Sequence, residues 1–176
     1  HNAMPAHGGM RIYDDPLVGF AAAQDPIFVE FQKQGVVGPD FLLPTEWLTG
    51  AKTVVSYFLP FTEEIRKSNR GSGLPSEEWV SARIDGEVLN NDVRSYLVGL
   101  LKELGGEGVS PCLDPRFGVK NRISNWSERH VAHAAGLGTF GLHRALITEK
   151  GTAGRLGSAV TTLEIAPTPR KYDRYD

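Results

Sequence analysis

The sequence predicts an α/β domain with a central mixed sheet flanked by helices. Two observations lead to this class. Residues 53–59 form an almost continuous apolar run rich in β-branched and aromatic side chains, and residues 93–104 carry an apolar stripe at helical spacing. A run that is apolar at nearly every position is typical of a strand covered on both faces. We therefore expect a sheet that packs between helices.

The chain of 176 residues has the length of one domain or slightly more. We expect a single α/β domain over residues 1–165. We also expect this domain to lack part of its N-terminal end, because a strand-like run starts at Met10 without a lead-in. Residues 166–176 contain two prolines and alternating charges, which predicts a linker that leaves the domain.

Composition excludes several classes of protein. The formal net charge is -2 and no basic stripe is present, so we expect no nucleic-acid partner. No apolar run reaches membrane-spanning length and the first residues lack a signal-peptide core, so we expect a cytoplasmic protein without membrane contact. Cys112 is the only cysteine, which excludes an intrachain disulfide and an iron–sulfur site built from four cysteines of this chain.

Two helical segments are expected before the apolar run. Asp25 and Pro26 are typical of a helix start, and the spacing of apolar residues predicts a helix over 27–34 that Gly35 ends. Residues 45–48 predict a single helical turn.

Strands and loops of the first half follow from composition. Residues 10–13 predict a short strand. The run at 53–59 predicts the central strand, and Pro60 ends it because proline cannot donate to a ladder. The polar and glycine-rich residues 62–74 predict a long loop.

Helix starts organise the middle of the chain. Ser76 is expected to cap one short helix, and Asn91 or Asp92 to cap a stronger one. The apolar stripe of this stronger helix consists of Val93, Leu97, Leu100, Leu101 and Leu104. Residues 109–113 predict a short strand and residues 114–122 a loop.

A glycine-rich stretch organises the last third of the chain. Asn125 and Glu128 have the spacing of a capping box, which predicts a helix over residues 127–135. Gly136 lies where a left-handed residue commonly closes a helix. Residues 136–141 contain three glycines and predict a tight loop.

Two further runs after this loop have strand composition, residues 145–148 and 156–165, and they are candidates to pair as a hairpin. The glycine loop itself has two interpretations, a plain connection or a cradle for a cofactor. It is not a dinucleotide fingerprint, because it follows a helix and leads to a strand.

Histidines near the glycine loop suggest a metal site as one alternative. His130 and His133 share a helix face, and His143 and Cys112 could complete a zinc site. The spacing does not match the usual zinc motifs, so the other interpretation is one hydrogen-bonded, partly buried histidine and exposed ones elsewhere.

Arginines flank the same loop. Arg129, Arg144 and Arg155 could bind an anionic tail such as phosphate, or they could be ordinary surface residues. No serine stands in a nucleophile-elbow pattern, so a serine hydrolase is not predicted.

Several short runs in this region recur together in one known family. They are Glu128-Arg129, Ala134-Ala135-Gly136-Leu137-Gly138 with Gly141, Leu146-Ile147-Thr148, Gly157-Ser158 and Val160-Thr161. Together they resemble the signature of the epoxyqueuosine reductase family and its iron–sulfur relatives, which share a corrinoid-binding core with reductive dehalogenases. Residues 51–60 resemble the first core strand of that family. The likeness extends from about Met10 to the end of the chain and is nearest to the anaerobe-type 4Fe-4S binding members.

The resemblance implies a corrinoid-binding, nitroreductase-like core and an oxidoreductase. Such a domain would bind cobalamin, receive electrons from 4Fe-4S clusters or a donor such as ferredoxin, and reduce a small-molecule substrate. The clusters would belong to a ferredoxin-like segment outside this chain, beyond residues 166–176. The residues expected to contact the cofactor are Gly136, Gly138, Thr139, Phe140, Gly141, His143, Arg144, Ser158 and Thr161.

One departure limits what the resemblance assigns. Arg122 stands where the queuosine enzymes have an acidic proton donor, so we assign no catalytic residue by resemblance. Two alternatives stay open: a flavin-dependent reductase that binds FMN, and a non-catalytic carrier of a corrinoid or of electrons.

Overall fold

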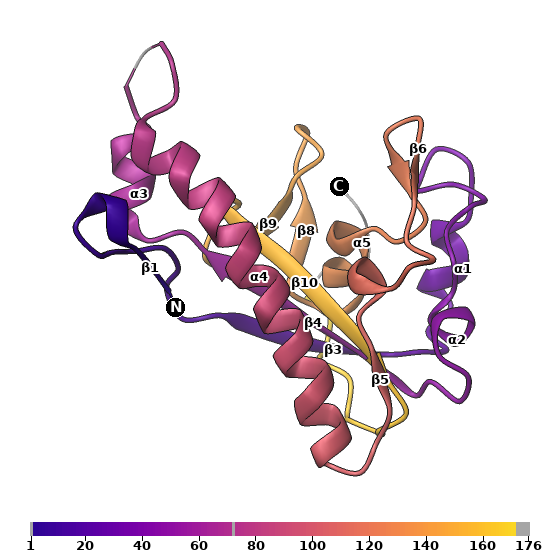
Figure 1. The fold of residues 1–176 in the computed structure, drawn as a ribbon. Helices are drawn as coiled ribbons and strands as arrows, with labels where there is room; N and C mark the ends of the chain where they lie inside the picture. Colours follow the sequence, from indigo (N-terminus) through magenta and orange to yellow (C-terminus); the bar gives the residue numbers. More distant parts are fainter. Residues whose placement is uncertain (1, 72, 172–176) are drawn as a thin grey trace.

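The computed structural model describes residues 2–71 and 73–171 (Figure 1). Its centre is a four-stranded antiparallel sheet in the order β3–β4–β10–β5. These strands are Leu17–Ala22, Thr53–Pro60, Gly154–Thr161 and Gly108–Val109, respectively. The α/β class is confirmed, but this sheet is antiparallel rather than mixed. An apolar run reports burial and not the direction of its neighbours, so the sequence pattern did not contain this information.

The run at 53–59 is the central strand, as predicted. All eight residues of β4 are buried, and β4 pairs with β10 from Thr53–Thr161 to Pro60–Gly154. Its other edge pairs with β3, an element that the sequence analysis missed. The side chains of β4 alternate between two packed faces, because successive residues of a strand point to opposite sides.

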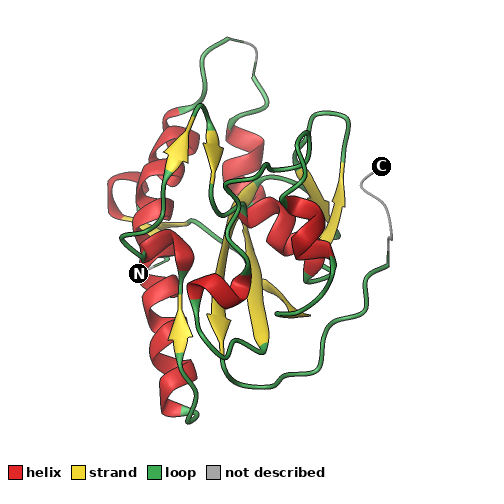
Figure 2. Cartoon of the chain, turned by 90° about the vertical axis from the view of Figure 1, so that its right-hand side faces the viewer, coloured by secondary structure: helices red, strands yellow, loops and turns green. Residues whose placement is uncertain are grey.

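Helices cover both faces of the sheet (Figures 1 and 2). On one face Val55 and Ala159 pack against Leu101 of the long helix α4, Glu77–Glu103. On the other face Val54 and Val160 belong to a core with the residues of α5, Glu128–Ala134. The prediction of helices on both sides of the sheet is therefore confirmed.

The two helices predicted between residues 76 and 104 are one. The Ser76 side chain accepts a hydrogen bond from the Trp79 amide at 3.1 Å, and α4 continues for 27 residues. Asn91 and Asp92 do not cap a second helix. Asn91 accepts a hydrogen bond from Arg94 and Asp92 is exposed, both within the helix. Their neighbour Asn90 is fully buried and donates to the Leu156 carbonyl of the sheet.

The predicted loop at 62–74 is wrong in part, because it contains helix α3, Glu63–Ser68. An ion pair between Glu63 and Lys67, four residues apart, supports this helix. The charged residues that indicated a loop are its solvent-facing side.

The remaining elements are short. They are β1 Ala3–Met4, β2 Met10–Arg11, α1 Ile27–Phe31, α2 Pro44–Trp47, β6 Val119–Lys120, β7 Ile123–Ser124, β8 Gly138–Phe140, β9 Leu146–Thr148, and the 3-10 turns η1 Pro5–His7 and η2 Pro111–Leu113. The predicted short strand at 10–13 and helix at 27–34 are confirmed with shorter bounds, and the helical turn predicted at 45–48 begins one residue earlier. The hairpin of β6 and β7 lies within the predicted loop at 114–122 and just beyond it.

The hairpin in the last third differs from the prediction. β9 pairs with β8, which lies inside the predicted glycine loop, whereas β10 joins the central sheet. After β10 the chain returns along β3. The Thr168 amide donates to the Phe20 carbonyl at 2.9 Å, and Arg170 forms an ion pair with Asp25 at 2.5 Å. Residues 172–176 of the predicted linker lie outside the described residues.

Within the part of the chain that is described, no helix combines the length and the apolar character needed to cross a bilayer.

Candidate functional site

The candidate site lies along the edge of β10 that the short strand β5 leaves uncovered. β5 pairs only with Val160 and Thr161, at the end of β10. Along the preceding residues, side chains take the place of a neighbouring strand. The Leu156 carbonyl accepts hydrogen bonds from Asn90 and Arg94, each at 3.1 Å, and the Ser110 hydroxyl donates to the Ser158 carbonyl at 2.8 Å. Side chains thereby satisfy the backbone carbonyls of Leu156 and Ser158 at this edge of the sheet, where no neighbouring strand does so.

Arg94 of α4 connects three elements at this edge. Only 6% of its side chain is exposed. Its Nη1 donates to Glu87 Oε1 at 2.9 Å and to Asn91 Oδ1 at 2.6 Å, while Nη2 donates to the Leu156 carbonyl. The same Nη2 lies 3.9 Å from Glu128 Oε1 at the start of α5. A buried guanidinium needs such partners, because an unpaired charge costs several kcal/mol.

Glu128 is the acid of this cluster. Cys112 Sγ donates to its Oε1 at 3.1 Å. Burial raises the pKa of Glu128 above the ordinary range of a glutamate, and the positive charge of Arg94 only partly opposes this. The Ser158 hydroxyl is close enough to favour the charged form but does not meet the carboxylate in hydrogen-bond geometry. Burial also raises the pKa of the Cys112 thiol, with the charge of Glu128 second, so Cys112 is a neutral donor.

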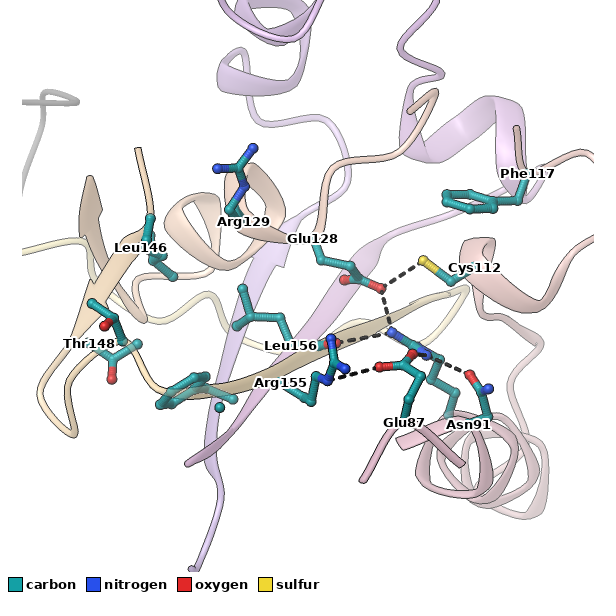
Figure 3. A pocket seen from close by; sticks show the side chains of 15 residues that line it. Glu87, Asn91, Cys112, Phe117, Glu128, Arg129, Leu146, Thr148, Arg155 and Leu156 are labelled. Carbon is teal, nitrogen blue, oxygen red and sulfur yellow. Dashed lines mark hydrogen bonds and ion pairs between the residues drawn. The ribbon is translucent and has the colours of Figure 1, made fainter. Parts of the chain in front are cut away.

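These residues line a cavity of about 600 Å³, which we call the acid cavity (Figure 3). Its polar wall contains Glu87, Arg94 and Glu128, and Arg155 forms an ion pair with Glu87 at 3.2 Å. Its other walls are largely apolar and consist of Phe58, Phe117, Leu146 and Leu156, with Thr148 of β9. The volume is in the range of small-molecule and cofactor sites.

A second hollow of about 600 Å³ adjoins the acid cavity, because Arg129 lines both. Its wall includes Arg122, His130, Phe140 and Arg144, and we call it the arginine hollow. Figure 3 shows the Arg129 side chain pointing away from the Glu128 carboxylate. Glu128 lines the acid cavity alone, whereas its neighbour Arg129 lines both hollows.

The predicted cofactor-binding glycines have conformational roles in the fold. Gly136 has φ +77 and closes α5, as predicted. Gly138 lies in β8, where a Cβ would stand 2.1 Å from the Ile147 carbonyl oxygen. Thr139 and Phe140 follow in the same strand. Close approach between two backbones therefore explains Gly138 without a cofactor.

The other predicted contact residues are divided between the core and the hollow. Ser158 and Thr161 are fully buried, and their hydroxyls bond to the Trp126 indole and the Glu107 carbonyl, respectively. Gly141 and Arg144 line the arginine hollow, and the exposed His143 lies between them in the turn from β8 to β9. Of the predicted set, Phe140, Gly141 and Arg144 therefore line the arginine hollow, whereas Gly136, Gly138 and Thr139 line a separate pocket of about 310 Å³.

The zinc alternative has no support in the described residues. They contain no group of three or more histidines, cysteines or carboxylates close enough to hold a metal ion. Cys112 faces Glu128, and His133 is buried with its Nδ1 2.9 Å from the Gly138 carbonyl oxygen. The interpretation of one hydrogen-bonded histidine in the core is confirmed for His133.

Sequence reasoning missed Glu87 and Arg94 as site residues. A usable signal existed, because Ala82, Gly86, Asn90 and Arg94 follow one another at intervals of four on the buried face of α4. Small and polar residues on a helix face that contacts a sheet indicate a close approach or a buried polar contact. The prediction of a separate helix with an apolar stripe starting at Val93 divided this set of four residues between two elements, so the pattern was missed.

Comparison with known structures first defines the class of fold: an α/β core found as part of larger reductases. The neighbours include an epoxyqueuosine reductase from Streptococcus thermophilus, with a TM-score of 0.50, 20% identity and coverage of 88% of this chain and 44% of that one. A selenomethionine-labelled epoxyqueuosine reductase, and one with an epoxyqueuosine-modified stem loop of tyrosine tRNA, each give a TM-score of 0.50 at 18% identity, covering 92% of this chain and 45% of theirs.

The fold of this chain is thus that of the epoxyqueuosine reductases, which confirms the resemblance read from the sequence at the level of fold. The chain spans less than half the length of these structures. No protein-family model matches it, and no curated protein matches it.

The described residues fit one of the implied cofactors better than the other. Arg94 Nε and Glu128 Oε2 are buried beside the acid cavity and form no hydrogen bond within the described chain. One is a donor and the other can accept, which suits a ligand with amide groups such as a corrinoid, and the two adjoining hollows offer room for a large ring. An iron–sulfur cluster does not fit, because the chain has one cysteine.

Proposed function

We propose that this chain is the cofactor- and substrate-binding core of a reductase similar to the epoxyqueuosine reductases, with Glu128 as its proton donor. The observation that carries the proposal is a buried carboxyl with a raised pKa that lines a ligand-sized cavity. Acids with these properties occur at catalytic sites more often than elsewhere. The shared fold supports the class. The resemblance places an acid at the position of Arg122, and in this proposal Glu128 supplies the proton instead.

The residues around Glu128 support the role of proton donor. Cys112 orients Oε1 through its hydrogen bond, which leaves Oε2 to hold the proton beside the cavity. Arg94 lies at 3.9 Å from Oε1 and favours the carboxylate that remains after the proton has left. Phe58, Leu146 and Leu156 keep water away from the acid, so the protonated form persists above the usual pH range.

A corrinoid is the cofactor that we propose, and when bound it would supply the electrons of the reduction at its metal. Arg94 would hold its polar side groups, and Leu146 and Leu156 would contact its ring. The 4Fe-4S clusters of the proposal belong to a segment outside this chain.

Spectroscopic titration tests the cofactor. Under anaerobic conditions the protein is titrated with cob(II)alamin and, in parallel, with FMN. We expect a saturable spectral change with cob(II)alamin, and Glu128→Gln should retain it because the amide keeps the shape of the acid. Saturation by FMN alone would favour a flavin-dependent reductase. No response to either ligand would contradict the proposal that this chain binds a corrinoid.

Infrared spectroscopy tests the donor. The carbonyl stretch of a protonated carboxyl is expected to persist at pH values above the ordinary glutamate pKa of about 4.3 in the native protein and to disappear in Glu128→Gln. Glu107→Gln, an exposed glutamate outside the cavity, should leave the band unchanged. A carboxyl that ionises at or below the ordinary pH range of a glutamate would remove Glu128 from the role of donor.

A nucleic-acid substrate is the second candidate. One of the similar structures contains a modified tRNA stem loop, which revises our expectation of no nucleic-acid partner. The net charge of -2 weighs against a large RNA interface within this chain alone. Binding of a tRNA stem loop that weakens steeply with salt would favour this candidate.

A further inference from the structure

The arginine hollow contains positive charge without any compensation. Arg122, Arg129 and Arg144 line it, and no aspartate or glutamate is among the described residues of its wall. None of the three forms an ion pair with a described carboxylate, whereas Arg94, Arg116, Arg155 and Arg170 all do. Three like charges around one hollow repel one another, so their arrangement is favourable only when an anion enters.

Two of these arginines occupy strained backbone positions at hairpin turns. Asn121 and Arg122 form the two-residue turn between β6 and β7, with φ +53 and +65. Glycine is the usual residue at the second position of such a turn. A side chain in this conformation costs about 1 kcal/mol.

The turn between β8 and β9 repeats the arrangement. Arg144 has φ +60, and its amide donates to the Gly141 carbonyl at 2.8 Å. This is the position at which a hairpin loop usually has glycine. Among the described residues, only Asn121, Arg122 and Arg144 combine a side chain with a positive φ. The two strained arginines thus lie at the tips of different hairpins and line the same hollow.

The third arginine connects the two sides of the hollow. Arg129 of α5 donates from Nη1 to the Arg144 carbonyl oxygen, which fixes the second turn relative to the helix. His130 and Phe140 have ring centroids 4.7 Å apart and form an aromatic part of the wall. Burial, with the charge of Arg129 second, lowers the pKa of His130 to about 4, so the ring is neutral near pH 7.

We propose that the arginine hollow binds the phosphate group of a small phosphomonoester with an aromatic or other flat ring. A phosphomonoester has close to two negative charges at neutral pH, which matches three guanidinium groups better than a single carboxylate does. Guanidinium forks bind phosphate oxygens in pairs. The rings of Phe140 and His130 offer a surface for the flat part of the ligand.

The inference deepens the proposed function, on which the role of this ligand as the substrate rests. The acid cavity adjoins the hollow at Arg129, so a ligand anchored by its phosphate could extend towards Glu128. A small-molecule ligand fits these observations better than RNA does. The three arginines are confined to one hollow, and the net charge of the whole chain is -2.

The experiment is calorimetric titration of the protein with phenyl phosphate, inorganic phosphate, benzoate and a tRNA stem loop. We expect phenyl phosphate to bind at least about tenfold more tightly than benzoate, because it has the greater charge. Arg122→Gln and Arg144→Gln should each weaken phenyl phosphate by about tenfold or more, and Arg122→Lys by less. Arg70→Gln, an exposed arginine outside the hollow, is the matched control and should leave the affinity unchanged.

Three results would overturn the inference: equal affinity for phenyl phosphate and benzoate, unchanged affinity in both glutamine variants, or a stem loop that binds and is not displaced by phenyl phosphate. Preferred binding of inorganic phosphate over phenyl phosphate would exclude the aromatic part of the ligand. These outcomes are independent of the cofactor, because cob(II)alamin binding is measured separately and the arginine variants leave Arg94 and Glu128 in place.

Discussion

The two hollows that meet at Arg129 contain the same kind of charge in opposite settings. In the acid cavity, Arg94 and Arg155 are partnered by Glu87 and Glu128. In the arginine hollow, the guanidinium groups of exposed residues face one another without a described carboxylate. A buried charge requires partners for the fold to be stable, because it has lost its hydration. An exposed charge remains hydrated and needs no partner within the protein. The difference indicates that the ion pairs of the first set stabilise the fold, whereas no ion pair with a described residue holds the charges of the second set.

Removal of Arg94 should have the largest effect on stability. Arg94→Met leaves the Leu156 carbonyl with one hydrogen bond fewer and leaves Glu128 without its buried positive charge. We expect a loss of about 3 to 5 kcal/mol in the free energy of unfolding, because Glu87, Asn91 and the Leu156 carbonyl all lose a buried, charged hydrogen-bond donor. Urea denaturation measures it. Lys102→Met, an exposed position on the same helix, should change stability little. A loss below about 1 kcal/mol for Arg94→Met would show that the two hollows do not differ in this way.

Gly138 tests whether the hairpin between the hollows depends on close backbone contact. In Gly138→Ala the new Cβ would stand 2.1 Å from the Ile147 carbonyl oxygen, so β8 and β9 must separate. We expect a loss of about 1 to 3 kcal/mol, as for other overpacked positions. Gly118→Ala is the control, since nothing lies within 4 Å of its Cβ. Weakened cob(II)alamin binding with full stability would restore the interpretation of Gly138 as a cofactor cradle.

Gly138 also illustrates how much of the site the sequence could predict. Three glycines at 136–141 marked a place where backbones approach closely, and this was correct. The pattern could not tell whether the approaching partner was a cofactor or the next strand, because both require the same absence of a Cβ. The central strand and α5 were predictable for a different reason. Their signals, an apolar run and polar residues ahead of a helix, are local in the sequence. The capping box itself was a wrong prediction, because Ser127 is the N-cap of α5 without a side-chain hydrogen bond and the Asn125 side chain instead bonds to the Gly118 amide and the Arg116 carbonyl.

The acid cavity was not predictable, because it is formed by contacts distant in sequence. Glu87, Cys112 and Glu128 lie on α4, η2 and α5, and only the sheet edge of β10 brings them together. In the sequence, Arg94 is one charged residue beside the apolar stripe of α4, and nothing near it in the sequence indicates that it is buried. The shortness of β5, which leaves that edge open, has no marker in the sequence.

The two hollows should influence stability with opposite dependence on pH. Burial raises the pKa of Glu128, so the folded chain keeps a proton that the unfolded chain loses above about pH 4.3. The contribution of Glu128 to stability therefore falls as the pH rises through that window. Burial lowers the pKa of His130 to about 4, so its contribution is lost as the pH falls from about 6.5 to about 4.

Urea denaturation of the native protein, Glu128→Gln and His130→Gln between pH 4 and 8 checks both signs. Relative to the native protein, Glu128→Gln should gain stability as the pH rises, and His130→Gln should gain stability as the pH falls. For His130→Gln we expect a change of about 1 to 3 kcal/mol across this window, whereas for Glu128→Gln the prediction is the sign of the change. Parallel curves for a variant and the native protein would mean that the group titrates alike in the folded and unfolded chain.

Removal of charge from the arginine hollow should have the smallest effect on stability. Arg122 is exposed and forms no ion pair with a described residue, so Arg122→Gln removes repulsion from Arg129 and Arg144 without breaking a contact. The turn keeps its positive φ with either side chain. We expect a change within about 0.5 kcal/mol, slightly stabilising at low ionic strength and absent at high salt, where the repulsion is screened. Urea denaturation at two salt concentrations measures it. Destabilisation of more than about 1 kcal/mol would mean that Arg122 supports the fold as Arg94 does, and the contrast between the hollows would then be one of exposure and not of role.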